Sequence, residues 1–340
     1  MDNQAEFALV GIKNKAAAQT ILKPTLSFWQ SVWRRLRQNK LAVFSLFFLI
    51  AVLLFALIST AFVSQNQANQ FDTNQVNRYK NLPPNSGLPI PGWNGYSKEL
   101  GSDKKVDFYK TNHIKEHFLF GTDTLGRSLA KRVVVGLRIS LLVAISATAI
   151  DLLIGVTYGL VAGWKGGWLD TVMQRIIEVI SSIPNLVVVT MLALLLGSGI
   201  TAIILAIALT NWVNMARQVR NMTLTLKERD YILAALTLGE RPSKIAIKHL
   251  IPNMAGTIIV QIMMTIPAAI MFEAVLSAIN LGVKAPTASL GSLIADAQNM
   301  LEYYPYQILI PAAILILVSL AFILLGDGLR DAFDPKAADE

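Results

Sequence analysis

The chain has 340 residues, of which 54% are hydrophobic and only 15% are charged, against about 25% charged residues in ordinary soluble domains. This composition excludes a typical soluble domain and indicates an integral membrane protein. The absence of cysteine excludes disulfides and thiolate metal sites. The net charge of +8 is spread between apolar runs, which indicates basic loops at a membrane surface rather than a nucleic-acid site.

The first predicted span is the uncharged apolar run 41–63. At about 1.5 Å per residue this run reaches roughly 34 Å, which is enough to cross a bilayer. Residues 1–40 are polar and end in a basic cluster: Arg34, Arg35, Arg37 and Lys40. Because basic residues gather on the cytoplasmic side, we expect residues 1–40 to form a cytoplasmic tail.

A long polar segment follows at 64–138, and its proline- and glycine-rich part predicts turns and extended loop. We expect an extracytoplasmic loop that ends in an interfacial helix before the second span. Four basic residues near its end oppose this placement: Arg127, Lys131, Arg132 and Arg138. Long loops follow the charge rule only weakly, so the predicted topology stands.

Residues 139–326 are predicted to form a five-helix core. The further spans are 139–163, 176–196, 200–213, 257–281 and 308–325. Pro184, Pro267 and Pro311 lie within spans and predict kinks or packing features. With six spans both termini are cytoplasmic, as is the polar loop 216–256. Gly326 and Asp327 are expected to stop the last span, which leaves 327–340 as a cytoplasmic tail.

Two carboxylates, Asp151 and Glu273, lie inside predicted spans. A charged side chain at the bilayer centre costs about 2.5–3.5 kcal/mol on insertion scales, so both should face the bundle or a water-filled path. Either could line the translocation path or contact the amino terminus of a peptide. The alternative is a structural hydrogen bond to a neighbouring helix.

The most informative stretch is 230–252, DYILAALTLGERPSKIAIKHLIP. Asp230 suits an N-cap and Gly239 suits the C′ position, so a short helix is predicted between them. Four residues at i, i+3, i+4 and i+7 share one face of it: Tyr231, Ala234, Ala235 and Leu238. Since this face is mostly small, a partner surface can approach it closely. The alternative is an amphipathic helix lying on the membrane surface.

This stretch resembles the EAA loop of ABC importer permeases, and its ending HLIPN is similar to the dipeptide/oligopeptide subfamily. Three further segments resemble that subfamily: GTDTLGRS…GLRISL at 121–141, LSAINLGV…PTASLG at 276–291 and GDGLRDAFDP at 326–335. The resemblance covers about 120–335. The chain departs from the family pattern at Leu233, Ser128, His249, Ala278 and Leu290.

The resemblance implies an all-α, six-helix ABC type I importer permease fold in a bacterial cell membrane. It identifies the chain as similar to the C-type permease subunit of an oligopeptide importer. It implies ATPase-coupling roles for these residues: Asp230, Tyr231, Ala234, Ala235, Leu238, Gly239 and Pro252. On this basis a bulky residue at Gly239 or Ala235 is expected to uncouple ATP hydrolysis from uptake while leaving the protein in the membrane.

The implied partners are a second homologous permease subunit, two ATP-binding subunits, an extracellular peptide-binding protein and the peptide itself. The sequence contains no G-x-x-x-x-G-K-[ST] phosphate loop, so ATP and Mg are expected on the ATPase subunits and no cofactor or metal on this chain. Three alternatives stay open. They are a permease for dipeptides, nickel or another small solute, a proton-coupled transporter using Asp151 and Glu273, and a membrane scaffold without transport.

Overall fold

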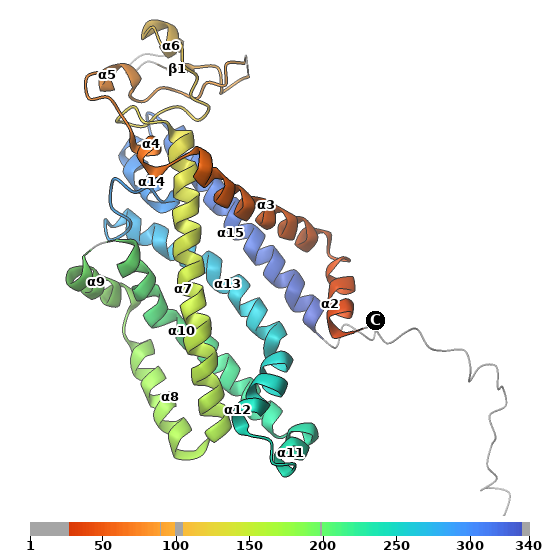
Figure 1. The fold of residues 1–340 in the computed structure, drawn as a ribbon. Coiled ribbons are helices and arrows are strands. Elements are labelled where there is room, and N and C mark those ends of the chain that lie inside the picture. The colour runs from red at the N-terminus through yellow and green to blue at the C-terminus, as the bar shows by residue number, and fades with distance from the viewer. Residues whose placement is uncertain (1–26, 89, 99–104, 198, 335–340) are drawn as a thin grey trace, which may run out of the picture.

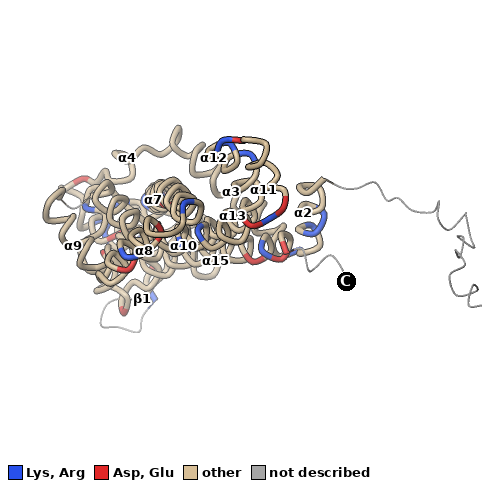
Figure 2. Tube along the Cα trace, turned by 90° about the horizontal axis from the view of Figure 1, so that it is seen from below, with Lys and Arg blue, Asp and Glu red and all other residues tan. Residues whose placement is uncertain are grey.

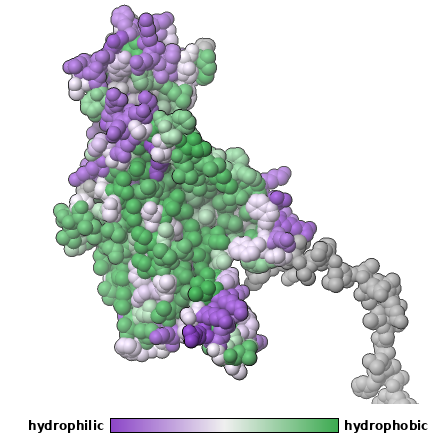
Figure 3. All heavy atoms as spheres, in the orientation of Figure 1, coloured by the Kyte–Doolittle hydropathy of each residue, from purple (hydrophilic) through white to green (hydrophobic). Residues whose placement is uncertain are grey.

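The computed structural model describes residues 27–88, 90–98, 105–197 and 199–334. The chain forms a long helical bundle with a small subdomain at one end (Figure 1). Apolar side chains cover the middle of the bundle and polar ones gather at its two ends (Figure 3). In the described residues five helices are long and apolar enough to cross a membrane, and a bent pair raises this to as many as six. The predicted all-helical membrane fold is confirmed.

Each of the five long helices overlaps a predicted span. They are α3 (Lys40–Phe62), α7 (Leu129–Lys165), α10 (Ile200–Lys227), α13 (Ile251–Ala278) and α15 (Tyr306–Phe333). Three of them extend well beyond the apolar runs, because backbone hydrogen bonding continues where the sequence becomes polar. The interfacial helix expected near residue 130 is therefore the first part of α7. The polar loop expected at 216–256 is also shorter, since α10 is helical to Lys227.

The predicted stop at Gly326 and Asp327 is wrong, because α15 continues to Phe333. The glycines in this part of α15 allow close packing instead of ending the helix. A Cβ atom at Gly328 would clash with the side chain of Ala42 on α3. Gly328 therefore allows α15 to pack against the first span, while Gly326 faces Met263 of α13.

The predicted span 176–196 is not one straight helix. It consists of α8 (Gly167–Ser182) and α9 (Asn185–Leu196), which meet at an angle of 82°. Pro184 lies at the break, and Ile183 before it adopts an extended backbone, as a residue preceding proline favours. Pro267 and Pro311, by contrast, lie inside the uninterrupted helices α13 and α15.

Helices α7 and α10 pack closely through three glycines of α7. A Cβ atom at Gly155 would lie 2.6 Å from the Met215 Cβ, and one at Gly159 would lie 2.5 Å from the Ala216 carbonyl oxygen. The next glycine, Gly163, faces Thr223 in the same way. In these contacts the residue numbers increase along both helices together, so α7 and α10 run parallel. Small residues at this spacing allow membrane helices to approach closely.

Residues 64–128 form the subdomain beyond the ends of α3 and α7 (Figure 1). Its elements are α4 (Gln65–Asn69), α5 (Val76–Tyr79), β1 (Tyr96–Lys98), β2 (Lys105–Asp107) and α6 (Phe108–Thr111). The two strands pair antiparallel, with Tyr96 opposite Asp107. Leu82, Tyr109 and Ile114 form a small buried core. The Tyr109 hydroxyl donates to the Pro83 carbonyl at 2.9 Å, which ties α6 to the loop.

The opposite end of the bundle carries α2 (Phe28–Leu36), α11 (Asp230–Thr237) and α12 (Pro242–Ile245), while α14 (Leu290–Ala297) lies toward the subdomain (Figure 1). Helix α2 packs on the last turn of α15, where the Phe28 and Phe333 rings stack at 6.1 Å. Arg35 Nη1 donates to the Asp334 carbonyl at 2.7 Å. Figure 2 shows charged residues gathered on α2, α11 and α12.

We predict that Gly159→Leu destabilises the bundle. The new side chain would drive α7 away from the Ala216 carbonyl, and overpacking of this kind costs about 1–3 kcal/mol or more. The measurement is thermal unfolding of the detergent-purified chain, followed by tryptophan fluorescence. Ala149→Leu, at an exposed position of the same helix, serves as the matched control. Equal unfolding midpoints for both variants would contradict the packing described here.

Candidate functional site

The docking helix α11 ends as predicted but begins differently. Arg229 occupies the N-cap position and Asp230 is the first helical residue, so the predicted N-cap at Asp230 is wrong. The cause is the extended backbone of Arg229, whose carbonyl accepts the first N–H groups of the helix. The Asp230 carboxylate lies in the first turn, where the helix dipole favours a negative charge.

Gly239 lies at C′ with φ +78°, as predicted. Its N–H donates to the Leu236 carbonyl at 2.9 Å, and the Glu240 N–H donates to the Ala235 carbonyl at 3.0 Å. This pair of bonds is a Schellman motif, which glycine favours because it adopts a left-handed backbone without strain. A Cβ atom at Gly239 would meet no atom within 4 Å. The space beside it is open to a partner.

The predicted docking face of α11 is divided in the structure. Ala235 is only 8% exposed and points inward with the fully buried Ile232, so its expected place on the outer face is wrong. Leu238 is 87% exposed, and Tyr231 and Ala234 are exposed beside it. Sequence reasoning missed two further exposed apolar residues, Leu233 and Leu236. The signal for them was present, since this short helix carries apolar residues almost all round.

The inner side of α11 rests on the long helices. Ile232 and Ala235 belong to a buried cluster with Met215 and Val219 of α10 and Met254 of α13. Position 235 requires a small side chain, because this side of α11 packs against α10. Helix α11 therefore shares one buried cluster with α10 and α13.

Pro252 lies in the first turn of α13, directly after a π-helical turn at Ala246–Leu250. Proline has no N–H to donate and its ring would clash with the carbonyl four residues earlier, so the widened turn accommodates it. Asn253 Nδ2 donates to the His249 carbonyl at 2.6 Å. Pro252 is exposed and thus shapes the connection from α12 to α13.

Glu240 joins the docking helix to the turn that precedes α13. Its carboxylate lies 3.2 Å from Lys244 Nζ, 3.8 Å from Lys248 Nζ and 3.2 Å from His249 Nε2. Burial works against the charged form, but the hydrogen bonds from Lys244 and His249 and the charges of both lysines together lower the pKa of Glu240. The ionised carboxylate therefore stabilises this connection.

Two polar contacts tie α10 to the hairpin of α7 and α8 at this end. Arg220 on α10 forms a bidentate ion pair with Asp170 on α8, with both N–O distances 2.6 Å. Lys227 Nζ donates to the Gly163 carbonyl at 3.1 Å. Paired hydrogen bonds of this kind fix orientation as well as distance. The end of α10 that leads into α11 is therefore tied to both α7 and α8.

Glu273 is fully buried and takes the hydrogen-bonding role that the sequence left as an alternative. Its carboxylate accepts from Ser277 at 2.8 Å, from Ser289 at 2.6 Å and from Ser140 at 3.1 Å. These residues belong to α13, the N-cap of α14 and α7. The carboxylate therefore joins three elements near the subdomain end of the bundle. A role for Glu273 in the translocation path stays a prediction.

Asp151 is 2% exposed and lies one turn before Gly155, on the face of α7 that packs against α10. Neither of its carboxylate oxygens has a hydrogen-bond partner among the described residues, and the same is true of the Thr148 hydroxyl. The expectation that Asp151 faces the bundle is confirmed. Its part in translocation, like that of Glu273, stays a prediction.

The turn at 121–128 joins the subdomain to α7. Gly121 and Gly126 both have positive φ, and Asp123 Oδ1 accepts from the Leu125 N–H at 3.0 Å. The other oxygen, Oδ2, pairs with Arg127 Nε at 2.7 Å and Arg132 Nη1 at 2.8 Å.

These ion pairs account for the basic residues that opposed the predicted topology. Arg127 and Arg132 pair with Asp123, and Arg132 also lies 3.3 Å from Asp296. Arg138 Nη2 donates to the Val63 carbonyl at 2.7 Å. Each of these three arginines therefore has a partner in the surrounding structure. Lys131 alone of the four is exposed.

A family model described as the binding-protein-dependent transport system inner membrane component matches residues 155–339, which is more than half of the chain. The chain belongs to this family. A second model, the N-terminal TM domain of oligopeptide transport permease C, matches residues 27–84 of the permease. The resemblance stated from the motifs is confirmed. The second model extends it to residues 27–84, which lie outside the motifs.

Relatives match the permease over nearly its whole length. A dipeptide transport system permease protein of Lactococcus lactis subsp. cremoris is 56% identical over 337 residues, which are 98% of each chain. An oligopeptide transport system permease protein of Bacillus subtilis is 38% identical, covering 95% of this chain and 94% of the relative. A solved inward-facing structure of the MetNI methionine ABC transporter shares the fold, with a TM-score of 0.50 and 18% identity over 60% of this chain and 96% of that one.

We predict that Glu240→Gln loosens the connection between α11 and α13. Because the folded-state pKa of Glu240 is lowered, ionised Glu240 stabilises the fold at pH above its ordinary pKa, and this stabilisation is lost as the pH falls through the lowered value. Since the chain has no cysteine, a nitroxide on Leu238→Cys reports local mobility cleanly. We expect a more mobile spectrum for Glu240→Gln at neutral pH.

Glu228→Gln is the matched control, since Glu228 is exposed and close in the chain. It should leave the spectrum of the nitroxide unchanged. Lowering the pH should make the spectrum of the Glu240-containing protein approach that of Glu240→Gln. Identical spectra for both variants at neutral pH would refute the role given to Glu240.

Proposed function

We propose that this permease is the transmembrane subunit of an ATP-driven oligopeptide importer, forms half of its translocation pathway and couples to separate ATPase subunits through α11. The observation that carries this proposal is the apolar outer face of α11 at a polar end of the bundle. Leu233, Leu236 and Leu238 are exposed there, beyond the helices long enough to span a membrane. Exposed apolar groups gathered at a polar surface are typical of a site for a protein partner.

The end of the bundle that carries α11 is proposed to be cytoplasmic, with both termini on that side. Support comes from the basic residues near α2, α11 and α12, since Lys and Arg gather in cytoplasmic loops. At the opposite end, Arg127 and Arg132 are paired with Asp123. The subdomain 64–128 then lies outside the cell membrane, where a peptide-binding protein can reach it.

The proposed partners are a second homologous permease subunit, two ATPase subunits that bind ATP and Mg, and an extracellular peptide-binding protein. The names of the relatives, which are dipeptide and oligopeptide permeases, support peptides as the substrate class. The long outer segment favours oligopeptides by analogy alone. No cofactor is proposed on this chain. Membership of the importer family leaves the proton-coupled alternative without support.

The proposed mechanism is alternating access. Closure of the ATPase subunits would move α11, and its inward residues Ile232 and Ala235 would pass that movement to α10 and α13. Because α7 and α10 are in close contact through glycines, the two helices would move together. A ligand favours transport only if it binds the alternating states with different affinity.

Bulky substitutions at Gly239 and at Ala235 are now expected to have different effects. A large residue at Gly239 is still expected to uncouple ATP hydrolysis from uptake, since nothing in this chain fills the space beside it. At Ala235 a large residue would disturb the contact of α11 with α10 and destabilise the segment itself. The position that tests docking from outside is Ala234.

We predict that Ala234→Trp abolishes co-purification of the ATPase subunits in mild detergent while the permease remains folded in the membrane. The large ring would occupy the exposed face of α11 where a close partner must lie. Asn77→Trp, at an exposed position of the subdomain, should retain the ATPases. If the Ala234→Trp complex keeps its ATPases and normal peptide uptake, α11 is not the coupling site.

A further inference from the structure

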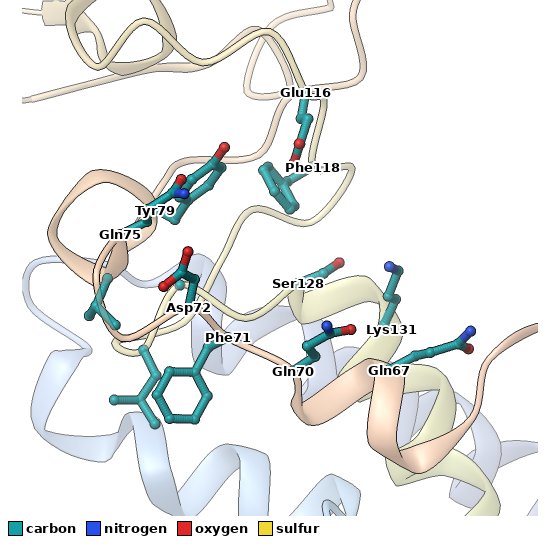
Figure 4. A pocket seen from close by; sticks show the side chains of 13 residues that line it. Gln67, Gln70, Phe71, Asp72, Gln75, Tyr79, Glu116, Phe118, Ser128 and Lys131 are labelled. Carbon is teal, nitrogen blue, oxygen red and sulfur yellow. The ribbon is translucent and has the colours of Figure 1, made fainter.

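A cleft of about 420 Å³ lies between the subdomain and the start of α7. Its walls come from α4, the segment leading into α5, the loop at 116–118, the turn at 125–128 and the first turn of α7 (Figure 4). This volume falls within the range of roughly 300–1,000 Å³ that small-ligand pockets occupy. The elements that form the cleft lie at the end of the bundle opposite α11 (Figure 1).

Charged side chains of both signs line the cleft. Lys131 reaches it from α7, and Asp72 and Glu116 reach it from the subdomain. Among the described residues, neither Lys131 nor Glu116 forms an ion pair, and one Asp72 oxygen accepts from the Asn74 N–H at 2.9 Å. Side chains of one sign would indicate an ion or a charged protein surface. Opposite charges around one concave space fit a small molecule that carries both charges.

Amide and aromatic groups complete the lining. Gln70 and Gln75 offer both hydrogen-bond donors and acceptors, which is the pairing that peptide groups require, and Gln67, whose Oε1 accepts from the Ser64 N–H, adds an amide donor. Tyr79 and Phe118 meet edge to face at 6.1 Å and present apolar surface between the charged groups. The lining is therefore mainly polar, with two aromatic rings beside the charged and amide groups, which suits a polar ligand that also carries apolar groups.

The cleft is held in shape by contacts that its lining residues make with the surrounding chain. Ser64 and Gln67 form a capping box that fixes α4, and the Thr122 hydroxyl donates to the Tyr79 carbonyl. Gly126 has positive φ and no room for a Cβ atom, which would lie 2.9 Å from the Tyr79 Cβ. Lys131 lies in the first turn of α7, just after the turn at 121–128 in which Asp123 is ion-paired. A site formed in advance loses less free energy on binding than one that must be ordered.

We propose that this cleft binds a short peptide with free ends on the outer side of the membrane, before the peptide enters the bundle. Asp72 and Glu116 would attract the ammonium group, and Lys131 would attract the carboxylate. This inference rests on the proposed peptide transport and adds a contact site for the substrate. The cleft is the size of a small-molecule site and so suits a short peptide better than a protein partner, because a stable protein interface buries about 800 Å² of surface on each partner.

The test uses the intact importer complex in nanodiscs, without its peptide-binding protein. The probe is trialanine, compared with N-acetyl-trialanine and trialanine amide, and binding is followed by saturation-transfer NMR. We expect trialanine to bind and each blocked peptide to bind more weakly. Lys131→Met should weaken trialanine binding about fivefold, as for the loss of one exposed ion pair, and should not affect the amide. Glu116→Gln should affect trialanine but change the acetylated peptide much less.

Lys115→Met is the matched control, because Lys115 is an exposed lysine of the same loop that does not line the cleft. It should bind trialanine like the unmodified complex. Since all three substituted residues are on the surface, equal thermal unfolding of the variants checks that folding is unchanged. The proposal is overturned if Lys131→Met binds like Lys115→Met, or if trialanine amide binds as well as trialanine.

Uptake of labelled trialanine by proteoliposomes, with the peptide-binding protein added, separates this proposal from the proposed function. If the complex imports the peptide but the cleft variants bind it unchanged, the cleft is wrong and the peptide importer stands. If the cleft binds trialanine with the expected dependence on free ends but no peptide is imported, the cleft stands and the proposed function fails.

Discussion

The close contact between α7 and α10 is the constraint on which the rest of the structure depends. Three glycines of α7 leave no space for side chains, so the two backbones approach as small residues allow in membrane helices. Between lipid-exposed helices there is no hydrophobic force to replace this packing, because lipid chains are as apolar as leucine. The two helices therefore form one unit, and elements at both ends are placed relative to it.

Polar interactions connect this unit to the two functional ends. Toward α11, the Arg220–Asp170 pair and the bond from Lys227 to Gly163 hold the base of the docking helix. Toward the subdomain, Arg132 pairs with Asp123, and Ser140 shares the buried Glu273 with α13 and α14. These contacts all involve α7 or α10, so both ends of the bundle are anchored on the same pair of helices.

Much of the membrane fold and part of the candidate site could be predicted from local pattern. Apolar runs mark most of the spans, and Gly239 ends the docking helix because a left-handed C′ position favours glycine over other residues. The same reasoning failed where a neighbouring helix decides. Ala235 faces inward because α10 lies there, and Pro184 separates two helices while Pro267 and Pro311 are accommodated in intact ones.

The sequence by itself determined the membrane class, the family and the location of the short helix α11, because each depends on composition or on residues close together in the chain. Only the tertiary structure decided which residues of α11 face outward, that Glu273 joins α7, α13 and α14, and that Arg127 and Arg132 are paired with Asp123. These outcomes depend on burial and on partners far away in sequence, and burial of a polar group is tolerated only when such partners are in place.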